Sequence, residues 1–340
     1  MAGVVAGQLL VGSARTAGQA LLRADEGARA GEVSRVAGAV ERDLAVASQA
    51  VDDFEKAVAA GAVDDRDEGS LRRYLLVTAI AHPSLAELAL TTAERTRYEA
   101  DGAIVLEADG RREISAARDS QGVLRVRPAA PFEPGSPDDP TRQDGFQAAA
   151  KLASKGQLVA GDLEWSTLDD PAAGSWRRKT LTVRKAIFGR GDRFVGVLRA
   201  SAVSDTLEQL GDHATRDGRT LFVCDTAGRL LTRIDGRDPY APVDGTGVLR
   251  VVPSTTPPRV AAALDWAKKG GRGATRLETG GDPTLVIVQP VARRPWLVGS
   301  VAGEGQLLAP IAASRGRSLS ILAGTLAGLI LIGAFLARRV

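Results

Sequence analysis

Two neighbouring stretches of the sequence alternate arginine with hydroxyl residues, a pattern that could bind an anion. Arg199 and Ser201 are two positions apart near the end of one stretch. The stretch before it carries Arg178, Thr180, Thr182 and Arg184. Because side chains two positions apart on a strand point to the same face, each set would form one surface. Guanidinium groups bind carboxylates and phosphates through paired hydrogen bonds, so such a surface favours these ligands.

Trp165 and Trp176 precede these stretches and could form a wall of the same site. The alternative is an exposed sheet whose arginines face solvent and enclose no pocket. Known catalytic motifs are absent from the sequence, which has only two histidines, so no catalytic residue is expected. The single cysteine, Cys224, excludes an intramolecular disulfide and a multi-cysteine zinc site. We therefore expect neither a metal nor a cofactor.

The two stretches would lie on a hairpin. Residues 180–203 read "TLTVRKAIFGRGDRFVGVLRASAV", with an alternating run, a glycine-aspartate tip and a second run rich in valine. Glycine and aspartate tolerate the backbone of a tight turn, so the pattern predicts two antiparallel strands. The net charge of +3 is small, and the many arginines are matched by acids, so no nucleic acid partner is expected.

A long helix should come before the sheet. Apolar residues recur at steps of three and four over residues 33–58, within a predicted helix of residues 1–60. This stripe could pack on a sheet or pair with the same helix of a second chain. We expect both, with the early part of the helix free to form a homodimer. A shorter helix over residues 71–82 should follow and end before Pro83.

Two antiparallel units are predicted after these helices, which makes the chain an α+β protein. The first unit, residues 61–210, contains short β-like runs separated by turns, and it ends with the hairpin. In the second unit, residues 211–312, "TLFVCDTAGRLLTRI" predicts a strand, a turn and a strand. The helix "PPRVAAALDWAKKGG" and two strands within "PTLVIVQPVARRPWLVGSVAG" should follow.

Residues 318–337, "SLSILAGTLAGLILIGAFLA", carry no charge. A helix of this length covers the roughly 30 Å hydrocarbon core of a bilayer, so a transmembrane helix is predicted. Basic residues lie on both sides of it and leave its orientation open. Residues 1–12 are apolar and too short to span; they either begin the long helix or are the remnant of a first transmembrane helix.

Four stretches resemble the double Cache family of bacterial extracytoplasmic sensors, whose two PAS-like modules stand on a long helix. The Trp-containing loop "EWSTLDDPAAGSW" and the hairpin of residues 180–203 resemble the membrane-distal module. The stretches "LFVCDTAGRLLTR" and "VIVQPVARRPWLVGSV" resemble the first and last strands of the membrane-proximal module. The individual motifs are loose, but their order and spacing match over nearly the whole chain.

This resemblance implies a ligand-sensing region of a transmembrane receptor, facing the periplasm or cell exterior and anchored in the inner membrane. The enzymatic or chemotactic output of such a receptor would lie beyond this chain, which is not itself expected to be an enzyme. Ser201 takes the position where amino-acid-binding members have an aspartate, and Arg199 one that is usually glycine. Losing a carboxylate and gaining a guanidinium predicts an anionic ligand. The alternative function is a membrane-anchored scaffold that docks another envelope protein.

Overall fold

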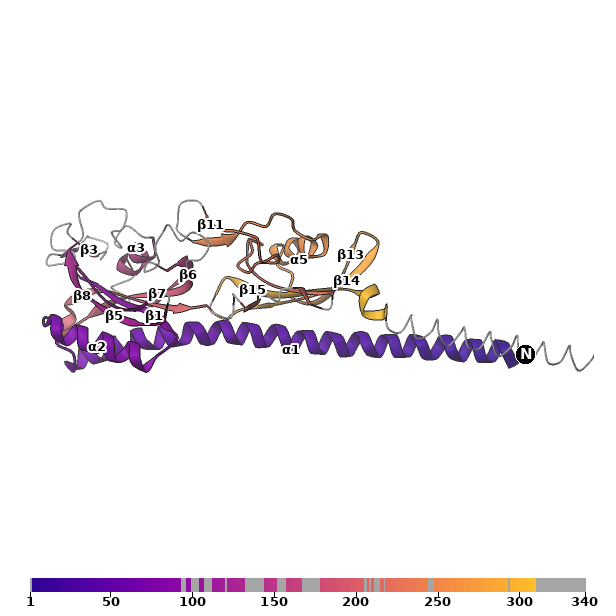
Figure 1. The fold of residues 1–340 in the computed structure, drawn as a ribbon, viewed down its shortest axis with the longest axis horizontal. Helices are drawn as coiled ribbons and strands as arrows, with labels where there is room; N and C mark the ends of the chain where they lie inside the picture. Colours follow the sequence, from indigo (N-terminus) through magenta and orange to yellow (C-terminus); the bar gives the residue numbers. More distant parts are fainter. Residues whose placement is uncertain are drawn as a thin grey trace, which may run out of the picture.

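A computed structural model of the chain shows one long helix running beneath two antiparallel sheets (Figure 1). It describes residues 2–92, 96–98, 104–106, 112–119, 121–131, 144–151, 157–166, 178–204, 207, 209–210, 215–216, 218–243, 248–292 and 294–309. The predicted α+β class is confirmed by this arrangement of a long helix and two antiparallel sheets.

Helix α1, Ala2–Ala60, is the long helix that the sequence predicts. Every member of its apolar stripe is buried: Val33, Val36, Val40, Leu44, Ala47, Val51, Phe54 and Val58. Gly61 ends the helix in the left-handed region, with a φ of 72°, which glycine adopts without strain. The stripe therefore packs on the sheets, which confirms the first of its two predicted roles. Pairing with a second chain stays a prediction.

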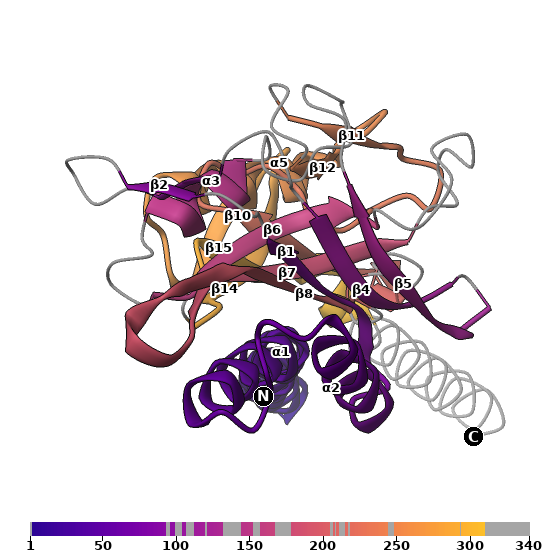
Figure 2. The same ribbon diagram turned by 90° about the vertical axis from the view of Figure 1, so that its left-hand side faces the viewer.

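Helix α2, Glu68–Ala81, lies beside α1 under the first sheet (Figure 2). The Asp67 carboxylate accepts the backbone N–H groups of Gly69 and Ser70, which caps the start of the helix. The rings of Phe54 and Tyr74 join the two helices, with centroids 5.4 Å apart. The two helices together cover one face of the sheet.

The first sheet has six strands in the order β5-β4-β1-β8-β7-β6. Its strands are β1 Leu85–Thr92, β4 Arg112–Arg118, β5 Leu124–Pro131, β6 Val159–Trp165, β7 Lys179–Phe188 and β8 Phe194–Val203. Strands β7 and β8 form the predicted hairpin, and Gly191 and Asp192 both have positive φ at its tip. Strands β2 Thr96–Tyr98 and β3 Ile104–Leu106 form a separate pair, and α3 Asp144–Lys151 lies on the face away from α1 (Figure 2).

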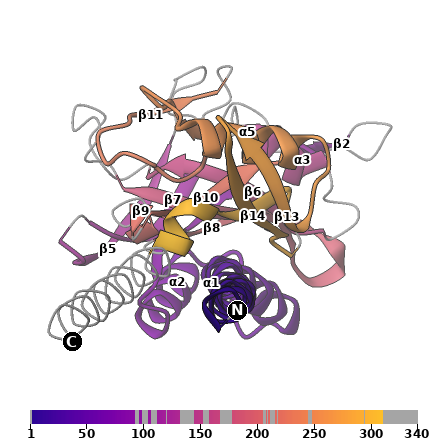
Figure 3. The ribbon, with the colours of Figure 1, turned by 90° about the vertical axis from the view of Figure 1, so that its right-hand side faces the viewer.

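The second sheet has five strands in the order β13-β14-β15-β10-β9. Its strands are β9 Thr215–Arg216, β10 Arg219–Asp225, β13 Gly273–Thr279, β14 Asp282–Pro290 and β15 Trp296–Gly303. Helix α5, Pro258–Lys268, covers the face away from α1 (Figure 3). Strands β11 Tyr240–Pro242 and β12 Leu249–Val251 form a pair on the same side. The helix and the last two strands predicted for this unit are confirmed.

One predicted strand is wrong, and six observed strands were not predicted. The stretch after the turn at Gly228 makes only an isolated bridge, Leu230 to Cys224. The Asp225 carboxylate accepts the N–H groups of Ala227 and Arg229, which holds this stretch in a compact turn instead of a hairpin. Strands β2, β9, β11 and β12, of two or three residues each, were missed, and so were the longer strands β6 and β13. Strands β6 and β13 each lie at the edge of their sheet.

Ion pairs that each contain one largely buried side chain, Lys185 or Asp25, fix α1 to both sheets. Lys185 of β7 points toward the helix and lies 2.9 Å from Asp52 and 2.7 Å from Glu55. Under the second sheet, Asp25 lies between Arg29 at 2.7 Å and Arg219 of β10 at 2.5 Å. Specific charges as well as the apolar stripe therefore set the position of the helix along the two sheets.

The predicted transmembrane helix of residues 318–337 lies outside the described residues. Among the helices within them, none combines the length and the hydrophobicity needed to cross a membrane.

Candidate functional site

The face of the six-stranded sheet that points away from α1 carries a band of polar side chains. We call this band the polar face; its members, on β1, β4, β7 and β8, are Glu87, Thr91, Glu113, Ser115, Thr182, Arg184, Arg199 and Ser201. Strand alternation sorts them from the apolar residues, such as Leu181 and Leu198, that point toward α1. Arg184 and Arg199 are directly opposite each other in the β7–β8 register.

The polar face is buried. The exposed fraction is 2% for Arg184 and 6% for Arg199. The alternative is therefore wrong in placing Arg184 and Arg199 in solvent, whereas its other part, the lack of a pocket, is not tested by this burial. Polar groups removed from water require partners, so the hydrogen bonds of this face determine what it can bind.

Arg199 is paired with carboxylates from two other strands. Its Nη2 atom donates to Glu87 Oε1 at 2.9 Å and lies 3.5 Å from Glu113 Oε1. Its Nε atom is buried and has no hydrogen-bond partner among the described residues. Burial acts to lower the pKa of the Arg199 guanidinium, but Glu87 and Glu113 raise it above its ordinary value. Arg199 thus stays charged and keeps a donor that an acceptor atom could use.

Of the two carboxylates beside Arg199, Glu113 lies farther from the guanidinium, at 3.5 Å against 2.9 Å for Glu87. It accepts a hydrogen bond from the Thr91 hydroxyl at 3.1 Å. Burial raises its pKa, and nearby Glu87 adds to that rise, whereas Arg199 and the Thr91 hydrogen bond partly lower it. A cationic group placed beside Glu113 would relieve this cost of burial.

The raised pKa of Glu113 predicts a particular dependence of stability on pH. Below the ordinary glutamate pKa the folded and unfolded states both hold the proton, and the contribution of Glu113 to stability is fully present. As the pH rises, the unfolded state releases its proton first, so stability falls by up to about 1.4 kcal/mol per pH unit until the folded pKa is passed. We expect the wild type to lose stability relative to Glu113→Gln as the pH rises above the ordinary glutamate pKa, measured by urea unfolding over a series of pH values. A difference that grows in favour of the wild type would mean that Arg199 governs this pKa.

The remaining polar side chains pair across strands. Thr182 and Ser201 share a hydrogen bond of 3.1 Å. Arg184 binds the Glu164 carboxylate of β6 through two hydrogen bonds, of 2.9 and 3.1 Å. The predicted set of Arg184, Arg199 and Ser201 is therefore brought onto one surface, together with carboxylates that the sequence analysis did not include.

The other predicted site residues lie elsewhere. Arg178 donates to the backbone carbonyls of Arg118 and Asp119 at the end of β4. Trp165 follows Glu164 on β6, so its side chain points to the opposite side of the strand. Its ring packs edge-to-face against that of Tyr240 in the second unit, with the ring centroids 6.1 Å apart. Trp176 lies outside the described residues.

The carboxylates Glu87 and Glu113 are the functional residues that the sequence analysis missed. Glu87 is the one charge in the buried strand "LAELALTT", two positions from Ala89 and four from Thr91. A lone charge on a strand buried along its length was a signal that could have been used. Counting Glu164, two guanidiniums face three carboxylates, which gives these five groups a net charge of minus one.

Strand β6 also links the polar face to the second unit. Asp162, two residues before Glu164, accepts two hydrogen bonds from Arg250 of β12, at 3.0 and 2.7 Å. The Nε atom of the same guanidinium donates to Asp225 of β10 at 2.9 Å. A ladder contact between Glu164 and Val248 lies alongside. Ion pairs therefore run from Arg184 on the polar face, along β6, into the second sheet.

The described residues contain no cluster of histidine, cysteine, aspartate or glutamate side chains suited to a metal ion. Cys224 is buried in the second unit, and burial raises the pKa of its thiol to about 12, which makes it unreactive. The chemistry of the polar face is thus that of hydrogen bonding and charge pairing.

Comparisons with known proteins place the fold. No family model and no curated protein matches the chain. Among solved structures, the extracellular domain of soHK1S-Z6, described as a histidine kinase, is 16% identical with a TM-score of 0.54, over 86% of this chain and 98% of that one.

Two chemoreceptor domains are similar to the same extent. The ligand-binding domain of a Pseudomonas aeruginosa amino acid chemoreceptor, in complex with GABA, is 16% identical with a TM-score of 0.52, over 82% of this chain and 99% of that one. The ligand-binding domain of the Campylobacter jejuni chemoreceptor Tlp3, in complex with L-norvaline, is 13% identical with a TM-score of 0.54, over 85% and 94%. The chain therefore has the fold of these bacterial extracellular sensor domains, as its resemblance to the double Cache family implied.

Proposed function

We propose that this chain is the ligand-sensing region of a membrane receptor and that it binds a small molecule on the polar face of the six-stranded sheet. The observation that carries the proposal is the state of Arg199. This buried guanidinium is held between two carboxylates, yet its Nε atom has no partner among the described residues. A buried donor without an acceptor is costly, and a bound ligand would supply the acceptor.

The ligand class follows from the charges. A purely anionic ligand, as the sequence predicted, would meet Glu87 and Glu113 as well as Arg199. We propose instead a zwitterion whose carboxylate binds Arg199 and whose ammonium group binds Glu113. The amino acid and GABA complexes of similar receptor domains support this class.

The proposal includes transmission of binding toward a membrane. Helix α1 passes under both sheets and is ion-paired to each, and Arg250 joins β6 to the second sheet. A shift of β6 on ligand binding would therefore reach the second unit through side chains that cannot move independently. Residues 318–337 would anchor the receptor in the inner membrane, with the sensor region outside as a homodimer. Any enzymatic or chemotactic output would belong to another part of the receptor.

Thermal denaturation of the full chain against amino acids, other amines and organic acids tests this function. At a hundred times its dissociation constant, a ligand adds about 2.7 kcal/mol, which raises the midpoint by several degrees. We expect such a shift from at least one amino compound. If no compound shifts the midpoint, the ligand proposal fails and the scaffold alternative gains support.

A further inference from the structure

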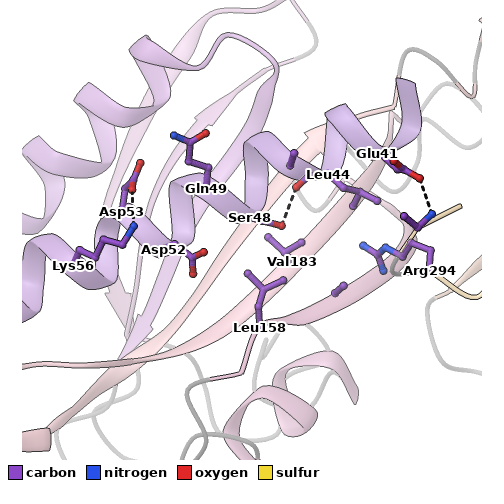
Figure 4. Close-up of a pocket in the computed structure, with 13 residues that line it drawn as sticks. Glu41, Leu44, Ser48, Gln49, Asp52, Asp53, Lys56, Leu158, Val183 and Arg294 are labelled. Atoms are coloured by element: carbon purple, nitrogen blue, oxygen red, sulfur yellow. Dashed lines mark hydrogen bonds and ion pairs between the residues drawn. The ribbon is translucent and has the colours of Figure 1, made fainter. Parts of the chain in front are cut away.

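A groove lies on the opposite face of the six-stranded sheet, between α1, the edge strand β6 and the β14–β15 turn. Its volume is about 790 Å³, within the range of small-molecule sites. Leu44, Leu158 and Val183 form its apolar wall, and Ser48 and Gln49 add polar groups from α1 (Figure 4). Val183 is the β7 neighbour of Thr182 and Arg184 and so points away from the polar face. The groove is therefore separate from the sensing site proposed above.

Arg294, from the β14–β15 turn, lies at one end of the groove. Figure 4 shows its guanidinium pointing toward Val183 and Leu158. Its Nη1 atom donates to the Gly161 carbonyl, and its planar group lies 5.3 Å from the Trp296 ring. Its Nη2 atom is buried without a hydrogen-bond partner, and Arg294 forms no ion pair with any residue that the structure describes.

The charges around Arg294 leave its guanidinium available. Asp52 is paired with Lys185 at 2.9 Å, and Asp53 lies 3.5 Å from Lys56. Glu41 accepts the backbone N–H of Ala292 at 2.6 Å, which fixes the turn on α1. Burial lowers the pKa of Arg294 to about 10, although Asp162 and Glu164 act to raise it, so the group is still a cation at neutral pH.

We propose that this groove is a second binding site, for a small monocarboxylate with an apolar body. The carboxylate would bind the free donors of Arg294, since guanidinium pairs with carboxylate in a planar, two-bond geometry. The apolar body would lie along Leu44, Leu158 and Val183. The nearby acidic side chains disfavour a dianion such as phosphate, which is why the proposal specifies a single negative charge.

Titration calorimetry of the full chain with hexanoate and octanoate, and with their uncharged amides, tests the proposal. We expect octanoate to bind more tightly than octanamide, and Arg294→Met to weaken octanoate binding by about tenfold or more, the effect of one charge-assisted hydrogen bond. The amide should bind the variant and the wild type equally. Arg294→Lys, which keeps the charge but not the planar two-bond geometry, should bind octanoate with an affinity between those of the wild type and Arg294→Met.

Lys56→Met is the matched control, because it removes one positive charge from the same groove at an exposed position. Its octanoate affinity should stay within about twofold of the wild type, since an exposed charge contributes little. Octanoate that binds Arg294→Met as tightly as the wild type would overturn the proposal. So would an absence of carboxylate binding to the wild type, or equal affinity for acid and amide.

Discussion

Replacing Asp25 by asparagine is expected to lower the free energy of unfolding by about 3 kcal/mol, because it breaks a buried ion pair from one side. Asp25 is the anion between Arg29 and Arg219, and Arg29 is 1% exposed. Burial already lowers the pKa of Arg29, and Asp25 is the main group that opposes this. Asparagine keeps one oxygen that can accept a hydrogen bond, but it removes the negative charge, so the buried Arg29 guanidinium would have only neutral acceptors, among them the Leu285 carbonyl. Urea unfolding of the full chain would measure the loss.

The same substitution at Asp265 is the control. Asp265 and Lys269 form an ion pair with the same spacing of four residues, but their side chains are 60% and 73% exposed. Asp265→Asn should cost about 0.5 kcal/mol or less. If the two variants lose the same stability, burial of the Asp25 network is not what holds α1 to the second sheet.

Replacing Arg250 by methionine should be at least as destabilising, by about 3–5 kcal/mol. The guanidinium binds Asp162 with two hydrogen bonds and Asp225 with one, and its side chain is 5% exposed. Burial acts to lower the pKa of Arg250, but the two carboxylates raise it. Methionine keeps the apolar stem and leaves both carboxylates without their shared cation. Urea unfolding would again report the loss.

Arg276→Met serves as the control for this variant. Arg276 is 54% exposed and pairs with Glu304 at 2.7 Å. Because solvent screens such a pair, we expect a cost of about 1 kcal/mol or less. A comparably small effect of Arg250→Met would contradict the role assigned to the link between β6 and the second sheet.

The long helix and the β7–β8 hairpin could be predicted because their signals are local. The apolar stripe of α1 repeats over many turns, and the hairpin tip carries the residues that a positive φ requires. Asp25 and Arg29 could not be recognised in the same way. Charged residues such as these are common on an exposed helix face. They are buried here only because the second sheet packs on them, and its Arg219 lies nearly 200 residues later in the chain.

Only the basic and hydroxyl residues of the candidate site could be predicted from the sequence; its carboxylates could not. Alternation along β8 places Arg199 and Ser201 on one face, which the structure confirms. This alternation does not show which strands lie beside β8. Strand β1 brings Glu87 to Arg199 although the two residues are 112 positions apart in the sequence. The predicted ligand charge therefore rested on the arginines without their carboxylate partners.

The two longest strands that the sequence analysis missed, β6 and β13, are sheet edges. In β13 exposed and half-buried residues alternate and none is fully buried, so its hydrophobic signal is weak. In β6 a register shift between Ala160 and Leu163 interrupts the alternation that identifies a strand. That shift lies next to Asp162, which binds Arg250.

The central claim is that the polar face binds a zwitterion through Arg199 and Glu113. Titration calorimetry with GABA and L-norvaline, each against its deaminated acid, butyrate or pentanoate, and extended to the common amino acids, tests it most directly. The full chain carries Arg294→Met in these titrations, so that the groove proposed for monocarboxylates does not contribute to the binding of the acids. We predict that at least one amine binds at least about tenfold more tightly than its acid, and that Glu113→Gln abolishes this preference, because a charge-assisted hydrogen bond contributes about 1.5–3 kcal/mol. Equal or tighter binding of the deaminated acids, or a preference that survives in Glu113→Gln, would contradict the claim.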